Sequence, residues 1–430
     1  MRPGPRVACV ALWVAAFGLG AAPGTARAQG VEAAQAGQSR QPPPDTQVDV
    51  FDVLRRLFKD PPTDPPADPS APSLPKDRGF QRSILPGFGY NPSAGFTIGA
   101  TGTLSTYFGH PATTRISSAV IGMSYSSKKQ ASLTAKFGAS LGDNRWRFDG
   151  DNRFQWTSQD SYGLGTGTSP ADSVYTRFTY VRIWNGVWYE LARNVYAGAG
   201  VHYSLHTNVR PGTEDDPAWE DSAYVVYTRQ NGFEPEGQTS AGFSLGAMLD
   251  TRDNPVNASR GWFAAVAYRP SIQNLLGGDA AIQETYVDVR SFFGVNKERS
   301  QRLAVWVYGD FVTSGTAPYF DLPAHGVSMQ GRPGRGHTEG RFRGEQLMYG
   351  EVEYRATLTR NGLIGMVAFL NTTTLANRET GEKLFDGFAT AGGVGLRVLF
   401  SKRTATNLCV DYAWGRQGSK GFYLGLQEAF

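Results

Sequence analysis

The chain has 430 residues, of which 42 are basic and 38 acidic, and its formal net charge is +4. This near balance gives no reason to expect nucleic-acid binding. The mean hydropathy of −0.35 and the lack of any run of about 20 apolar residues argue against a helical membrane protein. Glycine is frequent and aromatic residues make up 12% of the chain, a composition typical of membrane strands that line a polar lumen.

Residues 1–28 are predicted to be a secretory signal peptide. Arg2 and Arg6 precede an apolar stretch over residues 7–19, and Ala26-Arg27-Ala28 is a small-x-small cleavage site. The segment contains three arginines and no acid, so its removal would lower the net charge to +1. It would also leave Cys409 as the single cysteine, which excludes an internal disulfide.

Residues 29–80 are predicted to be a disordered periplasmic linker. The stretch 59–76 contains seven prolines and should be extended and semi-stiff. Within the linker, the segment 48–59 places its apolar residues on one side of a short helix and its basic residues on the other. This helix could lie on the inner leaflet of the membrane or plug the mouth of a barrel. A fluctuating segment is an equal alternative, because so short a helix is marginal in isolation.

Residues 81–430 are predicted to form sixteen strands of about ten residues each, separated by turn residues. Short connections alternate with connections that include four long ones, at 158–173, 209–237, 315–346 and 374–385. This alternation is typical of periplasmic turns and extracellular loops. The segment 222–229 has the composition of a strand, but a strand there would break the alternation, so we assign it to a loop. The predicted strands are 83–90, 95–106, 115–126, 130–141, 145–157, 174–190, 194–208, 238–250, 258–270, 283–294, 302–314, 347–358, 363–373, 386–400, 404–415 and 421–430.

Alternation within the strands predicts one polar and one apolar face. In strand 347–358, Glu351 and Glu353 fall on the face opposite Val352, and in strand 404–415 Asp411 falls opposite Val410. Ionised side chains are costly on a lipid-facing surface, so the charged face must line the lumen.

The last predicted strand carries a closure signal, because Phe422, Leu424, Leu426 and Phe430 share one face, which we expect to meet lipid. Glu428, on the same face, is expected near the periplasmic rim, where a charge is tolerated. The predicted fold is therefore all-β: a 16-stranded antiparallel transmembrane β-barrel in the bacterial outer membrane.

Several segments, in this order, resemble the barrel of the BamA/TamA family of outer-membrane assembly proteins, also called the bacterial surface antigen family. They are LDTRDNPVNASRG near 249–261, GRFRGEQLMYGEVEYR at 340–355 and NLCVDYAWG at 407–415, followed by the terminal phenylalanine. The resemblance covers residues 81–430 and implies a sixteen-stranded barrel.

The resemblance also implies that the loop 315–346 folds into the lumen and pairs an arginine with acids of the inner wall. The loop carries Arg332, Arg335, Arg341 and Arg343. In the family the loop tip reads Arg-Gly-aromatic, and the stretch that ends at Arg332 lacks the first arginine, so Arg341 or Arg343 becomes the preferred candidate. A solvated basic loop is the alternative. The expected acidic partners are Glu351, Glu353 and Asp411.

Family members that assemble or secrete proteins carry periplasmic POTRA domains, and residues 29–80 are too few to hold one. The resemblance therefore implies that the barrel assists protein insertion or translocation at the outer membrane with a separate periplasmic or POTRA-bearing partner. Pairing between the first strand, which contains Pro86, Gly87 and Gly89, and the short last strand should be weak and could open sideways. Outer-membrane lipid and lipopolysaccharide are the expected surroundings.

A passive outer-membrane channel is the alternative function. An outer-membrane phospholipase is a further one, because Ser140 and Ser244 each occupy the centre of a Gly-x-Ser-x-Gly motif. That motif needs a strand, a sharp turn and a helix, and both serines fall in or at the end of predicted strands. His202 and His206 would lie about 13 Å apart along a strand, too far to share a metal ion. The acidic loop near 214–221 could bind calcium only weakly, so no enzyme activity, cofactor or metal site is expected.

Overall fold

A computed structural model describes residues 47–58, 80–91, 94–110, 113–296, 300–327, 333–402, 405–426 and 428–430. All of these belong to one compact unit, Gln41–Phe430. The predicted signal peptide and most of the predicted linker lie outside the described residues.

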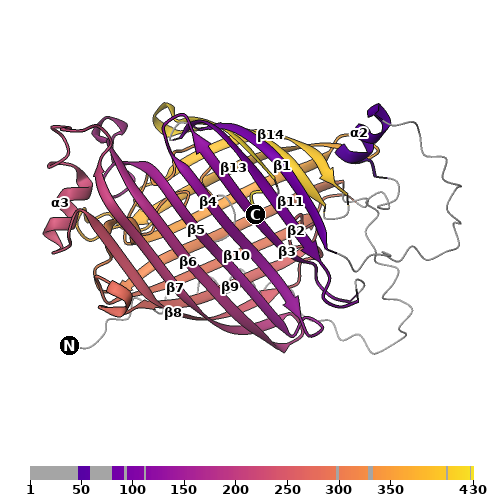
Figure 1. Cartoon of the computed structure of the whole chain (residues 1–430), viewed down its shortest axis with the longest axis horizontal. Helices are drawn as coiled ribbons and strands as arrows, with labels where there is room; N and C mark the ends of the chain where they lie inside the picture. The colour runs from indigo at the N-terminus through magenta and orange to yellow at the C-terminus, as the bar shows by residue number, and fades with distance from the viewer. Residues whose placement is uncertain are drawn as a thin grey trace, which may run out of the picture. The chain divides into compact units, whose positions relative to one another are not determined.

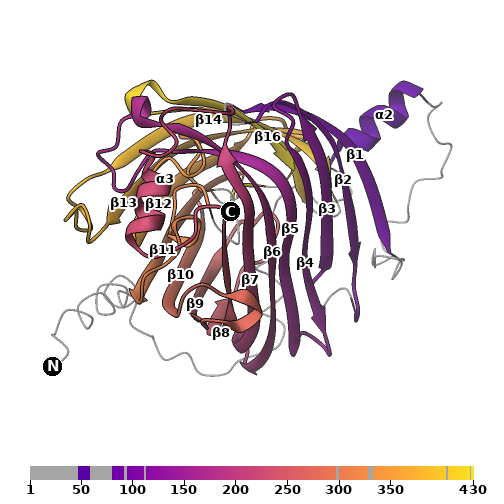
Figure 2. The same ribbon diagram turned by 60° about the vertical axis from the view of Figure 1, so that its left-hand side comes forward.

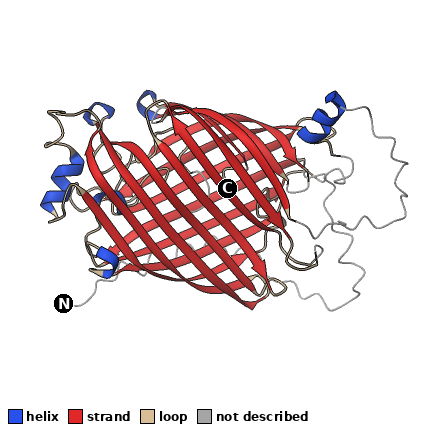
Figure 3. Cartoon of the chain, viewed as in Figure 1, coloured by secondary structure: helices blue, strands red, loops and turns tan. Residues whose placement is uncertain are grey.

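The described residues contain sixteen strands, two α-helices and four short 3-10 turns (Figure 3). The strands are β1 (Gln81–Asn91), β2 (Gly95–Thr106), β3 (Ser117–Ser126), β4 (Ala131–Leu141), β5 (Trp146–Ser161), β6 (Val174–Ala192), β7 (Val195–Pro211), β8 (Gly237–Asp250), β9 (Gly261–Ser271), β10 (Ile282–Gly294), β11 (Gln301–Ser314), β12 (Gln346–Thr357), β13 (Ile364–Ala376), β14 (Ala389–Ser401), β15 (Thr406–Gly415) and β16 (Lys420–Leu426). The helices are α2 (Val50–Phe58) and α3 (Ala223–Gln230), and the turns are η2 (Pro170–Asp172), η3 (Leu275–Gly277), η4 (Tyr319–Asp321) and η5 (Arg416–Gly418).

The strands form a single antiparallel meander in which each strand pairs with the next along the chain. The sheet curls until β1 and β16 are neighbours, as the yellow and indigo strands of Figure 2 show. Among the described residues, the backbone ladder runs from β1 to β16 without a rung that joins these two strands. The predicted sixteen-stranded architecture is confirmed, and its two terminal strands meet at a seam.

The four long connections all lie at one end of the sheet, as predicted. The turn between β4 and β5 needs left-handed backbone, which Asp143 (φ 54°) and Asn144 (φ 75°) provide at low cost. At the other end, the connections 162–173, 212–236, 315–345 and 377–388 are long. The chain thus has a periplasmic end with tight turns and an extracellular end with room for structured loops.

Alternating burial confirms which face of the sheet is the inside. In β12 the side chains of Tyr349, Glu351, Glu353 and Arg355 are buried, whereas Val352 is exposed on the outside. Inner-face charges are paired along the strand: Arg290 donates to Asp288 of the same strand at 2.6 Å, and the indole of Trp306 donates to the same carboxylate at 2.9 Å. Pairing of this kind lets a dry interior hold ionised groups.

The segment 222–229, expected to be part of a loop, is the helix α3 within the connection from β7 to β8. Ser222 caps it by accepting a hydrogen bond from the backbone N–H of Val225 at 3.3 Å. The strand count and the alternation of connections are preserved. Its buried Tyr224 and Tyr227 pack on Tyr319 of the β11–β12 connection, and α3 lies at the extracellular end of the sheet (Figure 1).

The helix α2 lies in the segment where sequence periodicity indicated a short amphipathic helix. It packs against the periplasmic end of β14: Phe51 contacts the ring of Phe400 with centroids 4.9 Å apart, and Asp52 pairs with Lys402 at 2.8 Å. Phe51 and Leu54 keep 40% and 44% of their surface exposed. The helix appears in indigo beside β14 in Figure 1, at the end opposite α3.

The end of the chain differs from the prediction. The strand β16 ends at Leu426, and Phe430 does not share the outward face of Phe422 but turns into the lumen, where it is buried. Its ring stacks at a tilt on Trp306, with centroids 5.0 Å apart, beneath the guanidinium of Arg355. The terminal aromatic therefore packs in the core and not against lipid.

Glu428 is buried and not at a solvated rim. It accepts a hydrogen bond from Arg397 at 2.8 Å and one from the amide of Asn407 at 2.7 Å. These partners on the inner face hold the terminal residues inside the barrel. The alternation of polar and apolar residues along a strand does not predict such contacts. Leu424 and Leu426 are partly exposed on the outer side together with Phe422.

We expect Phe430→Ala to destabilise the barrel more than Phe422→Ala does. Truncating Phe430 leaves a cavity beside Trp306 that nothing refills, at a cost of about 3–5 kcal/mol. Lipid or detergent refills the space left at the outward-facing Phe422. The temperature at which the compact, heat-modifiable band disappears on unboiled gels measures both variants, and equal temperatures would contradict the internal position of Phe430.

Candidate functional site: a loop arginine held in the lumen

The connection between β11 and β12 is a folded loop and not a solvated one. His325 donates its backbone N–H to the carbonyl of Phe342 at 2.8 Å, and Gly340 donates to the carbonyl of His325 at 2.7 Å. Its two halves therefore bind each other, and its described residues between Ala324 and Arg343 are mostly buried. Such burial means that the loop occupies the lumen of the barrel.

Arg335 is the centre of the loop's contact with the barrel wall. Its guanidinium donates to Asp411 of β15 at 2.7 Å and to both Glu351 and Glu353 of β12. The side chain is only 2% exposed, and all three carboxylates are fully or almost fully buried. A planar guanidinium can serve several carboxylates at once, which a lysine ammonium does less well.

The wall also provides a ring and an amide for this arginine. The guanidinium carbon of Arg335 lies 3.6 Å from the centre of the Phe369 ring of β13, and Asn371 of the same strand donates to the backbone carbonyl of Arg335 at 2.9 Å. A cation over an aromatic face gains most where water is excluded. Three strands of the same wall, β12, β13 and β15, thus bind one residue of the loop.

Two glycines allow the backbone on either side of Arg335 to come close enough. Gly334 has φ 82° and Gly336 has φ 105°, values that side-chain-bearing residues adopt only with strain. A Cβ atom at Gly334 would lie 2.3 Å from the imidazole of His325, and one at Gly336 would lie 2.5 Å from Ala391. The Gly-Arg-Gly sequence is therefore a steric requirement of this site.

The tip is fixed by neutral hydrogen bonds as well. Gly334 donates its N–H to the hydroxyl of Tyr349 at 3.1 Å, and Gly336 donates to the hydroxyl of Tyr423 in β16 at 2.9 Å. The Nε2 of His325 lies 3.0 Å from the carbonyl of Gly334, to which it must donate, so its Nδ1 accepts from Thr373 at 2.7 Å. The loop thus touches the last strand directly.

The charges around Arg335 form one connected network. Asp411 also binds Arg397 of β14, and Arg397 binds Glu428 of the terminal segment. Glu353 also binds Arg355, 2.6 Å away. The network contains four carboxylates and three guanidinium groups, so loss of any one cation leaves buried negative charge without compensation.

The arginine that binds the wall is not one that sequence analysis preferred. Arg341 binds the hydroxyl and carbonyl of Thr168 and the amide of Gln417, which are groups of the extracellular loops. Arg343 donates to the backbone carbonyls of Tyr319 and Leu322 within its own loop. Arg332 lies outside the described residues. Arg341 and Arg343 thus bind neutral groups of the loops, and neither forms an ion pair with Glu351, Glu353 or Asp411.

The three predicted acids, Glu351, Glu353 and Asp411, do come together on the inner wall. A signal for Arg335 was present in the sequence. Arg335-Gly336-His337 has an imidazole in the third position of the Arg-Gly-aromatic pattern, and His337 packs on Phe342 with centroids 5.1 Å apart. Counting histidine as the aromatic residue would have selected Arg335.

Residues that could suggest chemistry or metal binding lie elsewhere on the sheet. Ser140 lies in β4 and Ser244 in β8, and each strand is followed by another strand after its connection. His202 bonds to Ser271, 3.0 Å away, and His206 stacks on Tyr180. No group of three metal-ligating side chains occurs within the part of the chain that the structure describes. In the same residues no helix has the length and apolar character needed to cross a bilayer.

Comparison with known proteins identifies the family. Residues 108–430 match the model of the Omp85 superfamily domain, and the chain belongs to this superfamily. It is therefore a β-barrel protein of the bacterial outer membrane. No curated protein matches the sequence.

Several solved structures resemble this chain at low sequence identity. BamA from Haemophilus ducreyi lacking POTRA domains 1–3 matches with a TM-score of 0.50 and 10% identity, over 80% of this chain and 69% of that one. CdiB from Acinetobacter baumannii matches with a TM-score of 0.49 and 10% identity, over 82% of this chain and 60% of that one. OccK11 from Pseudomonas aeruginosa matches with a TM-score of only 0.32 at 10% identity, over 81% and 93% of the two chains.

We expect Arg335→Ala to destabilise the barrel by about 3–5 kcal/mol, because it leaves buried carboxylates without their shared cation. Arg341→Ala is the matched control, and its effect should be clearly smaller because its partners are neutral. Thermal gel shifts of the purified proteins in detergent measure both. Arg335→Lys should fall in between, because an ammonium cannot reach three carboxylates in the same geometry. If Arg335→Ala and Arg341→Ala lower the thermal stability equally, Arg335 is not the central residue of the site.

Proposed function

We propose that this Omp85 barrel assists the insertion or translocation of proteins at the outer membrane by opening sideways between β1 and β16. The observation that carries the proposal is the seam: the backbone ladder that joins all other neighbours is missing there among the described residues. Unpaired strand edges are costly in lipid and available to a substrate strand.

The sequences of the two strands support a weak seam. In β1, Pro86 lacks an N–H donor, and Gly87 has no side chain that could pack. The strand β16 has seven residues against eleven in β1, and the chain behind it turns into the lumen at Glu428. Part of the β1 edge therefore has no strand of matching length to pair with.

The filled lumen argues against the alternative of a passive channel. The β11–β12 loop occupies the interior through Arg335, and an apolar cluster of α3, η4 and the upper parts of β6, β10 and β11 lies at the extracellular end. Free diffusion of solutes needs an open polar path, as in porins. A blocked lumen with a weak seam suits a sideways route better than a central one.

The proposed activity involves no covalent chemistry. Ser140 and Ser244 lie within the wall, without the strand-turn-helix setting that a nucleophilic serine elbow needs. The barrel would act through strand exchange and local bilayer disturbance. A separate periplasmic or POTRA-bearing protein would receive the substrate.

Locking the seam should abolish the activity. The assay reconstitutes the barrel in liposomes and follows the folding of an unfolded eight-stranded barrel reporter by its gel mobility. Pairs of cysteines, one in β1 and one in β16, are introduced at successive positions in a Cys409→Ser background. When a pair is oxidised, the folding rate of the reporter should fall at least tenfold, because β-augmentation needs a free strand edge. Reduction of the disulfide should restore the rate.

The control for the lock is a disulfide that leaves the seam open. Tyr412 of β15 and Phe422 of β16 are direct partners in an existing ladder, so Tyr412→Cys/Phe422→Cys joins strands that are already paired. Its oxidation should leave the reporter's folding rate unchanged. If barrels locked at the seam are as active as this control, the sideways route is wrong.

Conductance separates the proposed function from the channel. We expect the wild-type protein in planar bilayers to give low, flickering currents, because the loop fills the lumen. Arg335→Ala should raise the open probability several-fold by freeing the loop, whereas Arg341→Ala should raise it less. A large, steady conductance of the wild-type protein would favour the channel instead.

A further inference from the structure

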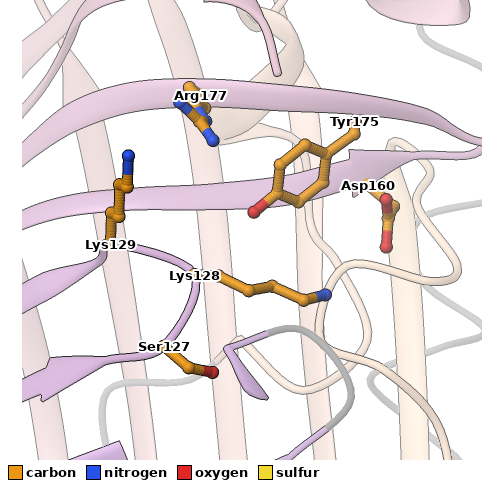
Figure 4. A pocket seen from close by; sticks show the side chains of 6 residues that line it. All are labelled: Ser127, Lys128, Lys129, Asp160, Tyr175 and Arg177. Carbon is orange, nitrogen blue, oxygen red and sulfur yellow. The ribbon is translucent and has the colours of Figure 1, made fainter. Parts of the chain in front are cut away.

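A pocket of about 430 Å³ lies at the extracellular end of the sheet, away from the lumen site. Its lining residues are Ser127, Lys128, Lys129, Asp160, Tyr175 and Arg177 (Figure 4). They come from the β3–β4 turn, the end of β5 and the start of β6. Both connections belong to the side of the sheet that carries the long loops, so the pocket lies at the extracellular rim.

The pocket opens on the outer face of the barrel. In β6, Val174, Thr176 and Phe178 are buried and point inward, so Tyr175 and Arg177 between them point outward. In β5, Asp160 shares its face with Trp156, which is 55% exposed and points toward lipid. Asp160 lies four residues beyond Trp156 along the strand, a distance of roughly 13 Å. The pocket is therefore just beyond the apolar surface, at the depth of lipid headgroups.

The pocket has an excess of positive charge. Three cations, Lys128, Lys129 and Arg177, line the pocket together with one carboxylate, that of Asp160. The ring of Tyr175 lies between two of these cations, 5.6 Å from the Lys128 ammonium and 5.9 Å from the Arg177 guanidinium (Figure 4). The net charge of the lining favours an anionic ligand with several oxygen acceptors.

A second observation points to the same ligand. Arg177 of β6 is directly opposite Arg210 of β7, and Arg210 is exposed. Like charges opposite each other on neighbouring strands destabilise a sheet unless an anion lies between or beside them. In the described part of the chain, Lys129, Arg177 and Arg210 form no ion pair with a carboxylate. Asp160 is the one acid in the pocket lining, so Lys129 and Arg177, with Arg210 beside them, leave an excess of positive charge there.

The pocket is held in place by hydrogen bonds. The hydroxyl of Ser158 donates to the hydroxyl of Tyr175 at 2.6 Å, and the side-chain amide of Gln130 donates to Ser158. These hydrogen bonds join the β3–β4 turn to β5 and β6, so the backbone that carries the two lysines is anchored beside the strands. A fixed arrangement lowers the entropic cost of binding.

We propose that this pocket binds the phosphate group of a glycolipid of the outer leaflet. The phosphate oxygens would accept hydrogen bonds from Lys128, Lys129 and Arg177, and the acyl chains would run along the exposed aromatic surface of β5 at Trp156 and Phe154. The inference is independent of the proposed seam, because it concerns the outer wall near β3–β6 and not β1 and β16.

The test measures binding of lipid A to the full-length protein in detergent by native mass spectrometry. Removing two cations with Lys129→Ala/Arg177→Ala should weaken binding of bisphosphorylated lipid A about tenfold or more. The control removes two exposed cations from other extracellular loops, Arg229→Ala/Lys383→Ala, and should leave binding within about twofold of wild type. Gel mobility before and after heating verifies that both double variants are folded.

Two further arms identify the source of the phosphate. Dephosphorylated lipid A should bind the wild-type protein as weakly as bisphosphorylated lipid A binds Lys129→Ala/Arg177→Ala. Inorganic phosphate should displace lipid A only at far higher concentration, because it lacks the acyl chains. Three results would each overturn the proposal. The two double variants could bind lipid A equally, dephosphorylated lipid A could bind as well as bisphosphorylated lipid A, or inorganic phosphate could displace lipid A at the same concentration.

Discussion

The loop between β11 and β12 and the barrel wall depend on one shared cation, the buried guanidinium of Arg335. Arg335 arrives in the lumen on a loop, and the barrel wall surrounds it with carboxylates from β12 and β15 and with an aromatic ring from β13. In a low-dielectric interior neither the guanidinium nor the carboxylates are stable alone. The wall therefore needs the loop as much as the loop needs the wall, and the filled lumen follows from this mutual requirement.

The same charge network extends to the end of the chain. Asp411 is shared between Arg335 and Arg397, and Arg397 also holds Glu428. The residues that could have extended β16 along β1 are thereby kept inside, where Phe430 fills an aromatic site next to Trp306. The missing ladder between β1 and β16 among the described residues thus accompanies the order of the interior: Glu428 and Phe430 bind groups of the lumen instead of extending β16.

Most of the fold could be predicted from the sequence, because alternation of polar and apolar residues has a fixed period in strands and a lipid-facing surface does not tolerate charge. The inward positions of Glu351, Glu353 and Asp411 followed from this rule alone. Phe430 could not be placed in this way: alternation assumes that the strand continues, whereas the pull of Arg397 and Arg355 on the terminal segment is a tertiary effect. The choice among the loop arginines failed for a similar reason, since the loop has no period and only three-dimensional packing decides which cation reaches the wall.

The positions of the Arg335 partners along the chain set an order of assembly. Glu351 and Glu353 follow Arg335 by 16 and 18 residues, whereas Asp411 follows it by 76. Nearby contacts form before distant ones because they close smaller loops. The β11–β12 hairpin can therefore fold its loop back onto β12 early, as a unit, and β15 completes the acid cage when it arrives. In this order the loop already occupies the lumen when β16, the last strand along the chain, comes beside β1.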